Sequence, residues 1–456
     1  MQLIKITRQD FVWSFIAYGL SIGSNILILP FILYFLPSNE VGLWFTFLSI
    51  AMLANLVDFG ISPSILRNTS YIWSGASELR KKGISDSIEK GKPNLILLNQ
   101  VINASKLIYL FISILALTII ASVGTLYIYE ITDNSSIKNI GYIWLIFCAG
   151  IFLNIAFNFW TPLLKGIGQI KQSQKALVIS KSLFVIISVV LLTIDLGLLG
   201  IAISYTLSGY TLRFFTKIYF LKYLNEINFK PRINFFGNLE KNLFDKIWFN
   251  SWRLGIVSLG AFAILQSNTL VCSYFFGLDF TASYGLAIQI FAVTAVLANT
   301  PYQTYLPRFN QVLSFKDFFK AKLIIVRCAQ LNWLIFILLS IFIILFLPQI
   351  ATYLMKSDFL MSSYMLIFMS VYLFLENNHS MFSGFIAAEN KIPFMKSAIF
   401  SGLGVIFLTL ILIYTTDIGI WTLLIVPAFV QLIYNNWKWP FTVIKKYNIK
   451  LSNFLK

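Results

Sequence analysis

Long apolar stretches that recur along the whole chain are the feature that most limits its fold. A helix needs about 20 mostly apolar residues to cross the core of a bilayer, and about a dozen stretches reach roughly that length. Only 12% of the residues are charged, against roughly 25% in an ordinary soluble domain. The sequence therefore predicts an all-α polytopic membrane protein of about 12 transmembrane helices. We place the spans at 11–36, 41–62, 106–129, 140–164, 177–194, 197–220, 252–277, 281–306, 326–348, 360–388, 394–415 and 417–440.

Positive charge lies almost entirely on one side of these spans. Of 35 Lys and Arg residues, only Lys138 and Lys356 fall in odd-numbered loops when the spans are counted from the N-terminus. Short loops rich in Lys and Arg stay in the cytoplasm, so we predict that the N- and C-termini are both cytoplasmic. Topology and anionic lipid headgroups account for the net charge of +17, and we therefore expect no nucleic-acid partner.

A basic cytoplasmic loop divides the spans into two sets of six. We predict an N-terminal half at 1–223, a linker at 224–250, a C-terminal half at 251–440 and a basic tail at 441–456. The two halves align weakly, with the start of the second span over the start of the eighth. Because each half begins in the cytoplasm and contains an even number of spans, the halves would be parallel repeats with a site between them near mid-membrane.

Two carboxylates lie within or at the end of predicted spans. Glu376 is near the middle of the tenth span, and an ionisable group at such a depth usually faces the bundle interior or a watery cavity. Asp58 ends the second span, just before a glycine and a Ser-Pro pair that indicate a helix stop and restart. We predict that both couple ion binding to transport. The alternatives are a packed, hydrogen-bonded carboxyl at Glu376 and a local pair between Asp58 and Arg67.

Arginine and amide side chains complete the candidate site. Arg offers a bidentate fork to phosphate oxygens, and three arginines near the cytoplasmic ends of spans are candidate phosphate ligands. The alternative for each arginine is that its side chain extends to the membrane–water interface or pairs with carbonyl groups at the C-terminal end of a helix. Asn and Gln side chains are concentrated in a few spans. They would either bind substrate or form hydrogen bonds between helices. The predicted substrate-binding residues are Arg213, Arg253, Arg308, Asn154, Asn158, Gln266, Asn268 and Asn299.

Motifs for ATP hydrolysis, metal binding and covalent catalysis are absent from the sequence. The dipeptide Gly91-Lys92 is followed by Pro93, and Asp86 stands where a phosphate-binding loop has its first glycine. The single histidine, His379, excludes a histidine-rich metal site. The three cysteines lie in or beside spans, which argues against a disulfide framework. We expect a protein that is not an enzyme and has no cofactor.

Three short stretches, together with the span pattern, resemble a known family. They are DFGISPSILR at 58–67, LKGIGQ at 164–169 and QSN at 266–268. They resemble the bacterial O-antigen (Wzx-type) flippases of the multidrug/oligosaccharidyl-lipid/polysaccharide (MOP) exporter superfamily, and the resemblance covers essentially the whole chain. It implies a MOP-type fold of two six-helix halves and a place in the bacterial cytoplasmic (inner) membrane.

The resemblance also implies a function. The substrate would be an undecaprenyl-pyrophosphate-linked oligosaccharide, a polyprenyl-pyrophosphate repeat unit of O-antigen or capsule, moved from the cytoplasmic to the periplasmic leaflet. Transport would proceed by alternating access, coupled to an H⁺ or Na⁺ gradient. Membrane lipids, a polysaccharide polymerase and a chain-length regulator would be its partners.

Other functions remain open. A drug/cation antiporter of the same superfamily favours carboxylates in the N-terminal half, where the spans offer only Asp58. A membrane polysaccharide polymerase usually has a large periplasmic loop, and every outward loop here is short. A major-facilitator sugar transporter needs a Gly-rich basic signature between its second and third spans, which is missing. Lipid II flippases carry cationic residues in the first span, and 11–36 contains none.

Overall fold

Helices make up nearly all of the computed structural model. The residues that it describes are 8–58, 60–73, 75–79, 93–133, 137, 139–232, 241–314, 317–354, 361–388 and 393–454. Every predicted span coincides with helix in these ranges, and none of the described residues forms a strand. The prediction of an all-helical fold is confirmed, since each apolar stretch satisfies its own backbone hydrogen bonds as a helix must within a membrane.

The chain forms two compact units. The first comprises Met1–Glu40 and Ile50–Ser258, and the second comprises Val41–Ser49 and Leu259–Lys456. Most of the N-terminal part of α2 thus belongs to the second unit, and α10 begins in the first unit and ends in the second. The predicted internal repeat and the predicted orientation of the termini stay predictions.

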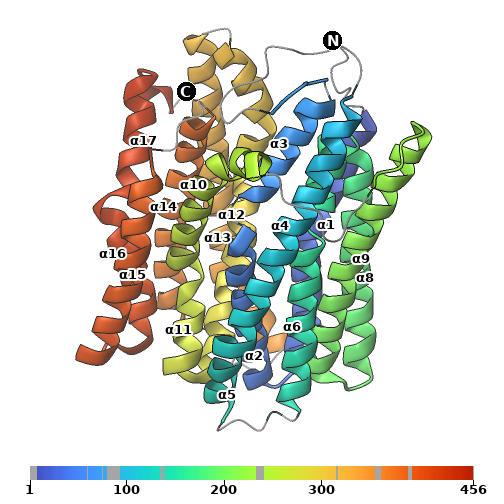
Figure 1. Cartoon of the computed structure of the whole chain (residues 1–456). Coiled ribbons are helices and arrows are strands. Elements are labelled where there is room, and N and C mark those ends of the chain that lie inside the picture. The colour runs from blue at the N-terminus through green and yellow to red at the C-terminus, as the bar shows by residue number, and fades with distance from the viewer. Residues whose placement is uncertain are drawn as a thin grey trace. The chain divides into compact units, whose positions relative to one another are not determined.

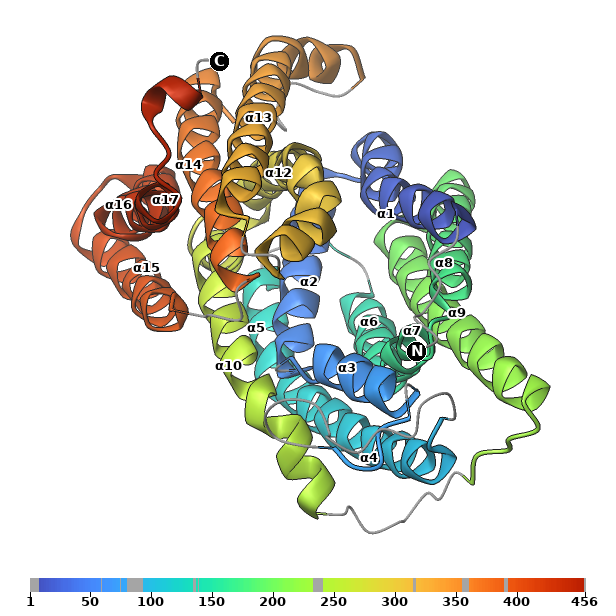
Figure 2. The ribbon, with the colours of Figure 1, turned by 90° about the horizontal axis from the view of Figure 1, so that it is seen from above.

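The first unit is drawn in blue to green in Figure 1. Within it α8 packs against α1 and α9, α9 also packs against α6, and α6 packs against α4. Figure 2 shows α1, α8 and α9 side by side. Its helices are α1 (Arg8–Phe35), α2 (Ser38–Asn55), the 3-10 turn η1 (Leu56–Asp58), α3 (Ile61–Trp73), α4 (Leu95–Ile119), the π-helical turn η2 (Ile120–Gly124), α5 (Thr125–Thr132), α6 (Ile140–Ala156), α7 (Trp160–Gly166), α8 (Ile170–Thr193), α9 (Gly197–Glu226) and α10 (Lys241–Leu265).

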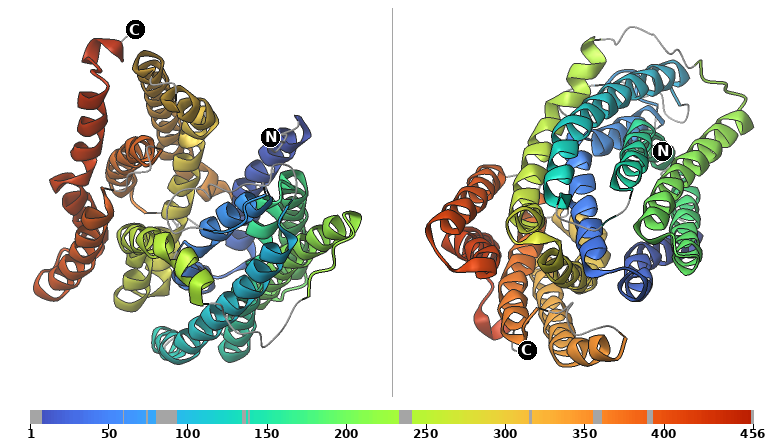
Figure 3. Two further views of the ribbon diagram at one scale, coloured as in Figure 1. Left: turned by 45° about the horizontal axis from the view of Figure 1, so that its top comes forward. Right: turned by 90° about the horizontal axis from the view of Figure 1, so that it is seen from below.

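The second unit is drawn mainly in yellow to red. Within it α13 packs against α12 and α14, α14 packs against α16 and α17, and α15 lies beside α16 (Figures 2 and 3). A glycine lets α2 approach α12 closely here: a Cβ on Gly285 would meet the Phe45 ring at 2.5 Å. Its helices are α11 (Ser267–Phe275), α12 (Gly277–Ser314), α13 (Phe318–Leu354), α14 (Ser363–Ala387), α15 (Met395–Thr415), the 3-10 turn η4 (Gly419–Trp421), α16 (Thr422–Ile433), α17 (Asn435–Lys446) and the 3-10 turn η5 (Leu451–Asn453).

Nine helical segments of the described chain are long and apolar enough to cross a membrane. The other three predicted spans fall on α1, α9 and α14, whose 28, 30 and 25 residues also suffice for a bilayer. Polar and charged residues make α9 and α14 less apolar than the rest. The nine segments are Ser38–Asp58, Leu95–Thr132, Ile140–Gly166, Ile170–Thr193, Gly255–Phe275, Gly277–Gln303, Phe318–Gln349, Met395–Thr415 and Gly419–Lys446.

Large apolar side chains lie on helix faces that no other described residue covers. Leu126 on α5 is 74% exposed and Phe400 on α15 is 72% exposed. Exposed apolar surface of this extent is typical of contact with lipid or with a partner. Lipid accounts for it on helices long enough to span a membrane.

Four of the spans are interrupted, and polar residues lie at each interruption. The breaks fall at Asp58 between α2 and α3, at 157–159 between α6 and α7, at Gln266 between α10 and α11, and at Tyr434 between α16 and α17. A broken helix in a membrane leaves backbone groups that other polar groups must satisfy. Such breaks are where transporters place binding sites, and they position the residues described below.

Candidate functional site

Arg213 lies at the centre of a polar cluster inside the first unit. Its Nε donates hydrogen bonds to the carbonyl oxygen of Asn154 at 3.1 Å and to Oδ1 of the same residue at 3.0 Å. Its Nη1 donates to Oγ1 of Thr161 at 2.9 Å. The guanidinium therefore ties α9 to both sides of the break between α6 and α7.

The break itself explains why the guanidinium binds there. In an unbroken helix the Asn158 amide would bond to the carbonyl of Asn154. Here it bonds to the carbonyl of Ile155 at 3.0 Å. The Asn154 carbonyl is left for Arg213, which supplies the missing donor. Of the predicted residues, Asn154 and Arg213 are thus brought into direct contact, and Asn158 forms the turn beside them.

Asp58 belongs to the same unit and binds a tyrosine. Its Oδ1 accepts a short hydrogen bond from the hydroxyl of Tyr109 on α4, and its Oδ2 accepts a long one from the Ser62 amide at 3.4 Å. Arg213 is near enough to attract the carboxylate electrostatically. The carboxylate therefore has Tyr109 and Ser62 as its hydrogen-bond partners, in place of the local Arg67 pair considered from the sequence.

Three lysines surround this cluster. Lys165, one turn after Thr161 on α7, lies close enough to Arg213 for the two charges to repel each other. Lys217 follows Arg213 by one turn of α9, and its Nζ lies 6.0 Å from the centroid of the Trp160 ring. Lys217 in turn repels Lys106 on α4. The first unit thus gathers four cations on three helices, and Lys217 is the exposed one.

A pocket of about 170 Å³ lies in the second unit. Apolar side chains form most of its wall, and polar groups come from α12, from α14 and from the α10–α11 break. Three residues predicted from the sequence, Gln266, Asn299 and Glu376, line it together. Its lining residues are Leu265, Gln266, Ile288, Phe291, Ala292, Ala295, Asn299, Leu373, Glu376, Asn377 and Ser380.

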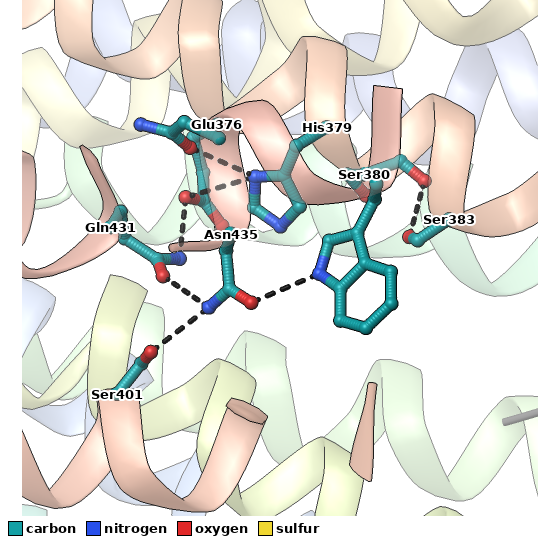
Figure 4. Close-up of polar contacts among 9 residues, drawn as sticks. Glu376, His379, Ser380, Ser383, Ser401, Gln431 and Asn435 are labelled. Carbon is teal, nitrogen blue, oxygen red and sulfur yellow. Dashed lines mark hydrogen bonds and ion pairs between the residues drawn. The ribbon is translucent and has the colours of Figure 1, made fainter. Parts of the chain in front are cut away.

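Glu376 connects this pocket to the break between α16 and α17. Its Oε2 accepts a hydrogen bond from Nε2 of Gln431 at 2.6 Å and lies 3.5 Å from Nδ1 of His379 (Figure 4). Nδ1 of His379 is also 3.1 Å from Oδ1 of Asn436, so the ring lies between a carboxylate and an amide. Glu376 therefore lines the pocket and is also hydrogen-bonded. The sequence had suggested these two arrangements, a cavity-facing carboxylate and a hydrogen-bonded carboxyl, as alternatives.

The hydrogen bonds continue from Gln431 along the break. Nδ2 of Asn435 donates to Oε1 of Gln431 at 2.7 Å and to Oγ of Ser401 on α15 at 2.9 Å (Figure 4). Oδ1 of Asn435 accepts from the Trp439 indole at 2.9 Å. A continuous network therefore runs from Glu376 through the twelfth span to α15.

A second network lies on the neighbouring face of α14. Nδ2 of Asn377 donates to Oδ1 of Asn332 at 3.0 Å, and Nδ2 of Asn332 donates to Oδ1 of Asn299 at 3.2 Å. Asn299 closes the ring by donating to Oδ1 of Asn377. Three amides from α12, α13 and α14 thus form a closed ring, and two of them also line the pocket.

The remaining predicted residues lie elsewhere. Asn268 is 1% exposed and its Nδ2 donates to the carbonyl of Leu423 at 2.8 Å, which joins α11 to α16. Arg253 and Arg308 belong to α10 and α12, and their side chains lie outside the described residues.

Several residues of these networks were not identified from the sequence. Lys106, Lys165 and Lys217 could have been noticed as cations within or beside apolar stretches. Asn332 and Gln431 lie in the ninth and twelfth spans, where a lone amide in an apolar stretch is the available signal. Among the described residues no three His, Cys, Asp or Glu side chains are grouped as a metal site requires.

Comparison with known proteins relates the chain to transporters by structure. No protein-family model and no curated protein sequence matches it. The inward-facing structure of a multidrug resistance MATE family transporter of the MOP superfamily aligns with a TM-score of 0.64 and 16% identity over 98% of each chain. MATE in complex with MaL6 aligns with a TM-score of 0.58 and 18% identity over 97% of this chain and 96% of its own.

A third structure is a MOP superfamily transporter from Pyrococcus furiosus, for which a binding pocket of reverse polarity suggests a different function. It aligns with a TM-score of 0.57 and 16% identity over 98% of this chain and 96% of its own. At these identities the likeness establishes the fold. The chain has the fold of the MATE transporters, and the predicted MOP-type fold is confirmed.

Proposed function

We propose that this chain is a flippase that moves a polyprenyl-pyrophosphate-linked oligosaccharide from the cytoplasmic to the periplasmic leaflet of a bacterial inner membrane. Membrane-spanning helices and the MATE fold support a membrane transporter. Fold alone does not choose the substrate. The choice depends on the charge of the groups inside each unit.

The observation that carries the proposal is the set of cations in the first unit. Arg213, Lys165, Lys217 and Lys106 lie near one another, and the carboxylate in their surroundings, Asp58, already binds Tyr109. Gathering like charges is costly, because they repel one another. A bound polyanion offsets that cost, and a pyrophosphate group carries the charge and the oxygen acceptors to do so. An organic cation would be repelled.

In transport, each unit would have its own task. Cations of the first unit would hold the pyrophosphate while the prenyl chain remains in lipid. In the second unit, Glu376 would bind and release an ion, and Gln431 and His379 would hold its carboxylate in place. Asp58 would act as a second ion-coupling group beside Tyr109. Alternating access would then follow from movement of the broken helices.

The transport cycle proposed here needs no covalent chemistry. Flipping a lipid headgroup breaks no covalent bond, so the protein would act without catalytic residues or a cofactor. Periplasmic assembly of the oligosaccharides would fall to a polysaccharide polymerase and a chain-length regulator as partners.

A drug/cation antiporter is the second candidate, and the pocket of the second unit favours it. The described residues that line this pocket are mostly apolar and include one carboxylate, Glu376, and no lysine or arginine. An organic cation would find both apolar contact and a counter-charge there. For the Pyrococcus furiosus transporter, too, the polarity of the binding pocket bears on the function suggested.

One cellular experiment separates the two candidates. A strain that lacks its own O-antigen flippase and accumulates lipid-linked repeat units is complemented with this chain, and surface polysaccharide and ethidium efflux are measured in parallel. Restored polysaccharide with unchanged efflux is the result expected of a flippase. Increased efflux with no restored polysaccharide would favour the antiporter instead.

A further inference from the structure

We infer that Lys106, Lys217 and the indole N–H of Trp160 form a phosphate-binding site in the first unit, beside the Arg213 cluster. The ligand class is a phosphate or pyrophosphate group. This inference deepens the proposed function and rests on it only for the identity of the lipid that carries the phosphate.

Three helices bring these groups together. Nζ of Lys217 on α9 lies 6.0 Å from the centroid of the Trp160 ring at the start of α7. Lys106 on α4 is near enough to Lys217 for their charges to repel each other. Lys217 is exposed, Lys106 is half-buried and Trp160 is only 3% exposed. The site therefore extends from an accessible cation inward to a buried donor.

The buried donor is the observation that indicates a ligand. The indole nitrogen of Trp160 has no hydrogen-bond acceptor among the described residues. Because indole can only donate, the group needs an acceptor, and buried polar groups without one are rare in folded proteins. Its ring packs against Phe159 and Phe220, at centroid distances of 4.5 and 5.7 Å, and phenyl rings offer the N–H no oxygen.

Two more buried donors lack an acceptor on adjoining helices. They are Nδ2 of Asn68 on α3 and Oγ of Ser105 on α4, and α3 packs against both α4 and α7. Oγ1 of Thr69 on α3 is a further buried hydroxyl without a partner among the described residues. A deficit of acceptors, concentrated next to a group of cations, is what an anion site looks like when its anion is absent.

Arg213 adds positive charge beside this site, but two of its three guanidinium nitrogens are used within the protein. Its Nε and Nη1 are already engaged by Asn154 and Thr161. Lys217 follows it by one helical turn, and two like charges at that spacing repel each other. A phosphate between Lys217 and Lys106 would relieve this repulsion. Lysine also suits the role, because its ammonium is a compact charge with three rotatable donors.

The test uses the purified full-length protein in phosphatidylcholine nanodiscs, titrated with inorganic pyrophosphate by calorimetry. Lys106→Gln and Lys217→Gln should each weaken binding at least tenfold, as expected for loss of a charge-assisted contact. Trp160→Phe should weaken it several-fold. The matched control is Lys175→Gln, because Lys175 on α8 forms the same kind of contact, 5.0 Å from the Trp13 ring centroid, and it should bind like the wild type.

Unchanged binding in both lysine variants, or an equal loss in Lys175→Gln, would overturn the site, as would absence of pyrophosphate binding to the wild type. The source of the phosphate is resolved by competition. Undecaprenyl pyrophosphate that displaces the probe at far lower mole fraction than phosphatidylglycerol identifies the lipid carrier. Equal displacement by phosphatidylglycerol identifies a phospholipid headgroup, and the phosphate site stands in either case.

Failure of this inference is distinguishable from failure of the proposed function. If the wild-type protein binds pyrophosphate through these residues but does not restore polysaccharide export, the site is retained and the flippase is refuted. If export is restored while the lysine variants bind pyrophosphate normally, the flippase is retained and the site is refuted.

Discussion

The guanidinium of Arg213 holds both the backbone carbonyl and the side-chain oxygen of Asn154, so two residues that were predicted as separate substrate ligands are partners of each other. The pairing follows from a break in the fourth span, which frees the Asn154 carbonyl. Arg213 therefore completes the backbone of a broken helix. It contributes charge to the interior of the first unit while its Nε and Nη1 donors are used within the protein.

Replacing this arginine should reduce stability. In Arg213→Lys the planar fork is lost, and one ammonium cannot reach Asn154 and Thr161 in the same way. Hydrogen bonds that involve a charged group are worth about 1.5–3 kcal/mol each, so we expect a loss of about 2–4 kcal/mol in the free energy of unfolding. Denaturation in mixed SDS micelles measures it. Thr161→Val should cost about half as much, and wild-type stability of Arg213→Lys would contradict this role.

The ring of hydrogen-bonded Asn side chains in the second unit predicts that Asn332, which does not line the pocket, contributes to stability. Asn332→Leu leaves Asn299 and Asn377 each without one partner. Interhelical hydrogen bonds in membranes average about 0.6 kcal/mol and reach about 1.7 kcal/mol. We expect a loss of about 1–3 kcal/mol in unfolding free energy. Ser340→Ala, on the same helix and with no hydrogen-bond partner for its Oγ among the described residues, serves as the control and should change stability by less than about 0.5 kcal/mol.

Close packing of α10 on α15 gives a test of the second unit's fold. A Cβ on Gly260 would meet the Ala398 carbonyl oxygen at 2.5 Å, so Gly260→Ala forces the helices apart. Overpacking of this kind costs about 1–3 kcal/mol. Gly404→Ala is the matched control, because its Cβ would meet Val430 at an ordinary 3.5 Å. Equal thermal stability of the two variants would mean that α10 and α15 are not packed this closely.

Stability should depend on pH at the start of α13. Asp317 accepts a hydrogen bond from the Lys320 amide at 3.0 Å and pairs with its ammonium at 3.0 Å, and these contacts lower the pKa of the carboxyl below its usual 3.8. A lowered pKa in the folded state contributes stability above the usual value, and that stability is lost as pH falls through the lowered one. Asp317→Asn should remove this acid-dependent part of the unfolding curve. An unchanged pH profile would contradict the prediction.

If Glu376 couples an ion to transport, replacing its carboxyl should reduce transport without changing the structure. In Glu376→Gln the amide oxygen still accepts from Gln431, so the protein should fold and reach the membrane. Transport driven by a pH or sodium gradient should fall at least tenfold, since no titratable carboxyl remains at the pocket of the second unit. Glu226→Gln, at the end of α9, is the control. Gradient-driven transport in proteoliposomes measures both, and a wild-type response of Glu376→Gln would assign coupling to another group such as Asp58.

Most of the fold was predictable because each apolar stretch is long enough to specify a helix by itself. Helix breaks were partly predictable: Asp58 is followed by a glycine and a proline, whereas the residues on either side of the break at Gln266 include neither. Gln266, Asn299 and Glu376 were predicted individually, and the structure brings them to one pocket. The arrangement depends on which helix faces meet, and no local pattern encodes that.

The residues missed from the sequence share a physical reason. A lone amide such as Asn332 in an apolar stretch can bond to any neighbouring helix, so its partners are visible only in the folded chain. Lys106 and Lys217 were counted as cytoplasmic charge, since cations near span ends usually extend to the interface. Their proximity to Trp160 required the packing of α4, α7 and α9.

The central claim is that the substrate is an anionic lipid-linked oligosaccharide. The most direct test reconstitutes the purified protein in proteoliposomes that contain a fluorescent undecaprenyl-pyrophosphate-linked oligosaccharide, and measures its transfer between leaflets with a membrane-impermeant quencher. The account predicts transfer that depends on the protein and is slowed by Lys106→Gln and Lys217→Gln. Absence of transfer, together with gradient-driven uptake of ethidium by the same vesicles, would contradict it and establish a cation antiporter.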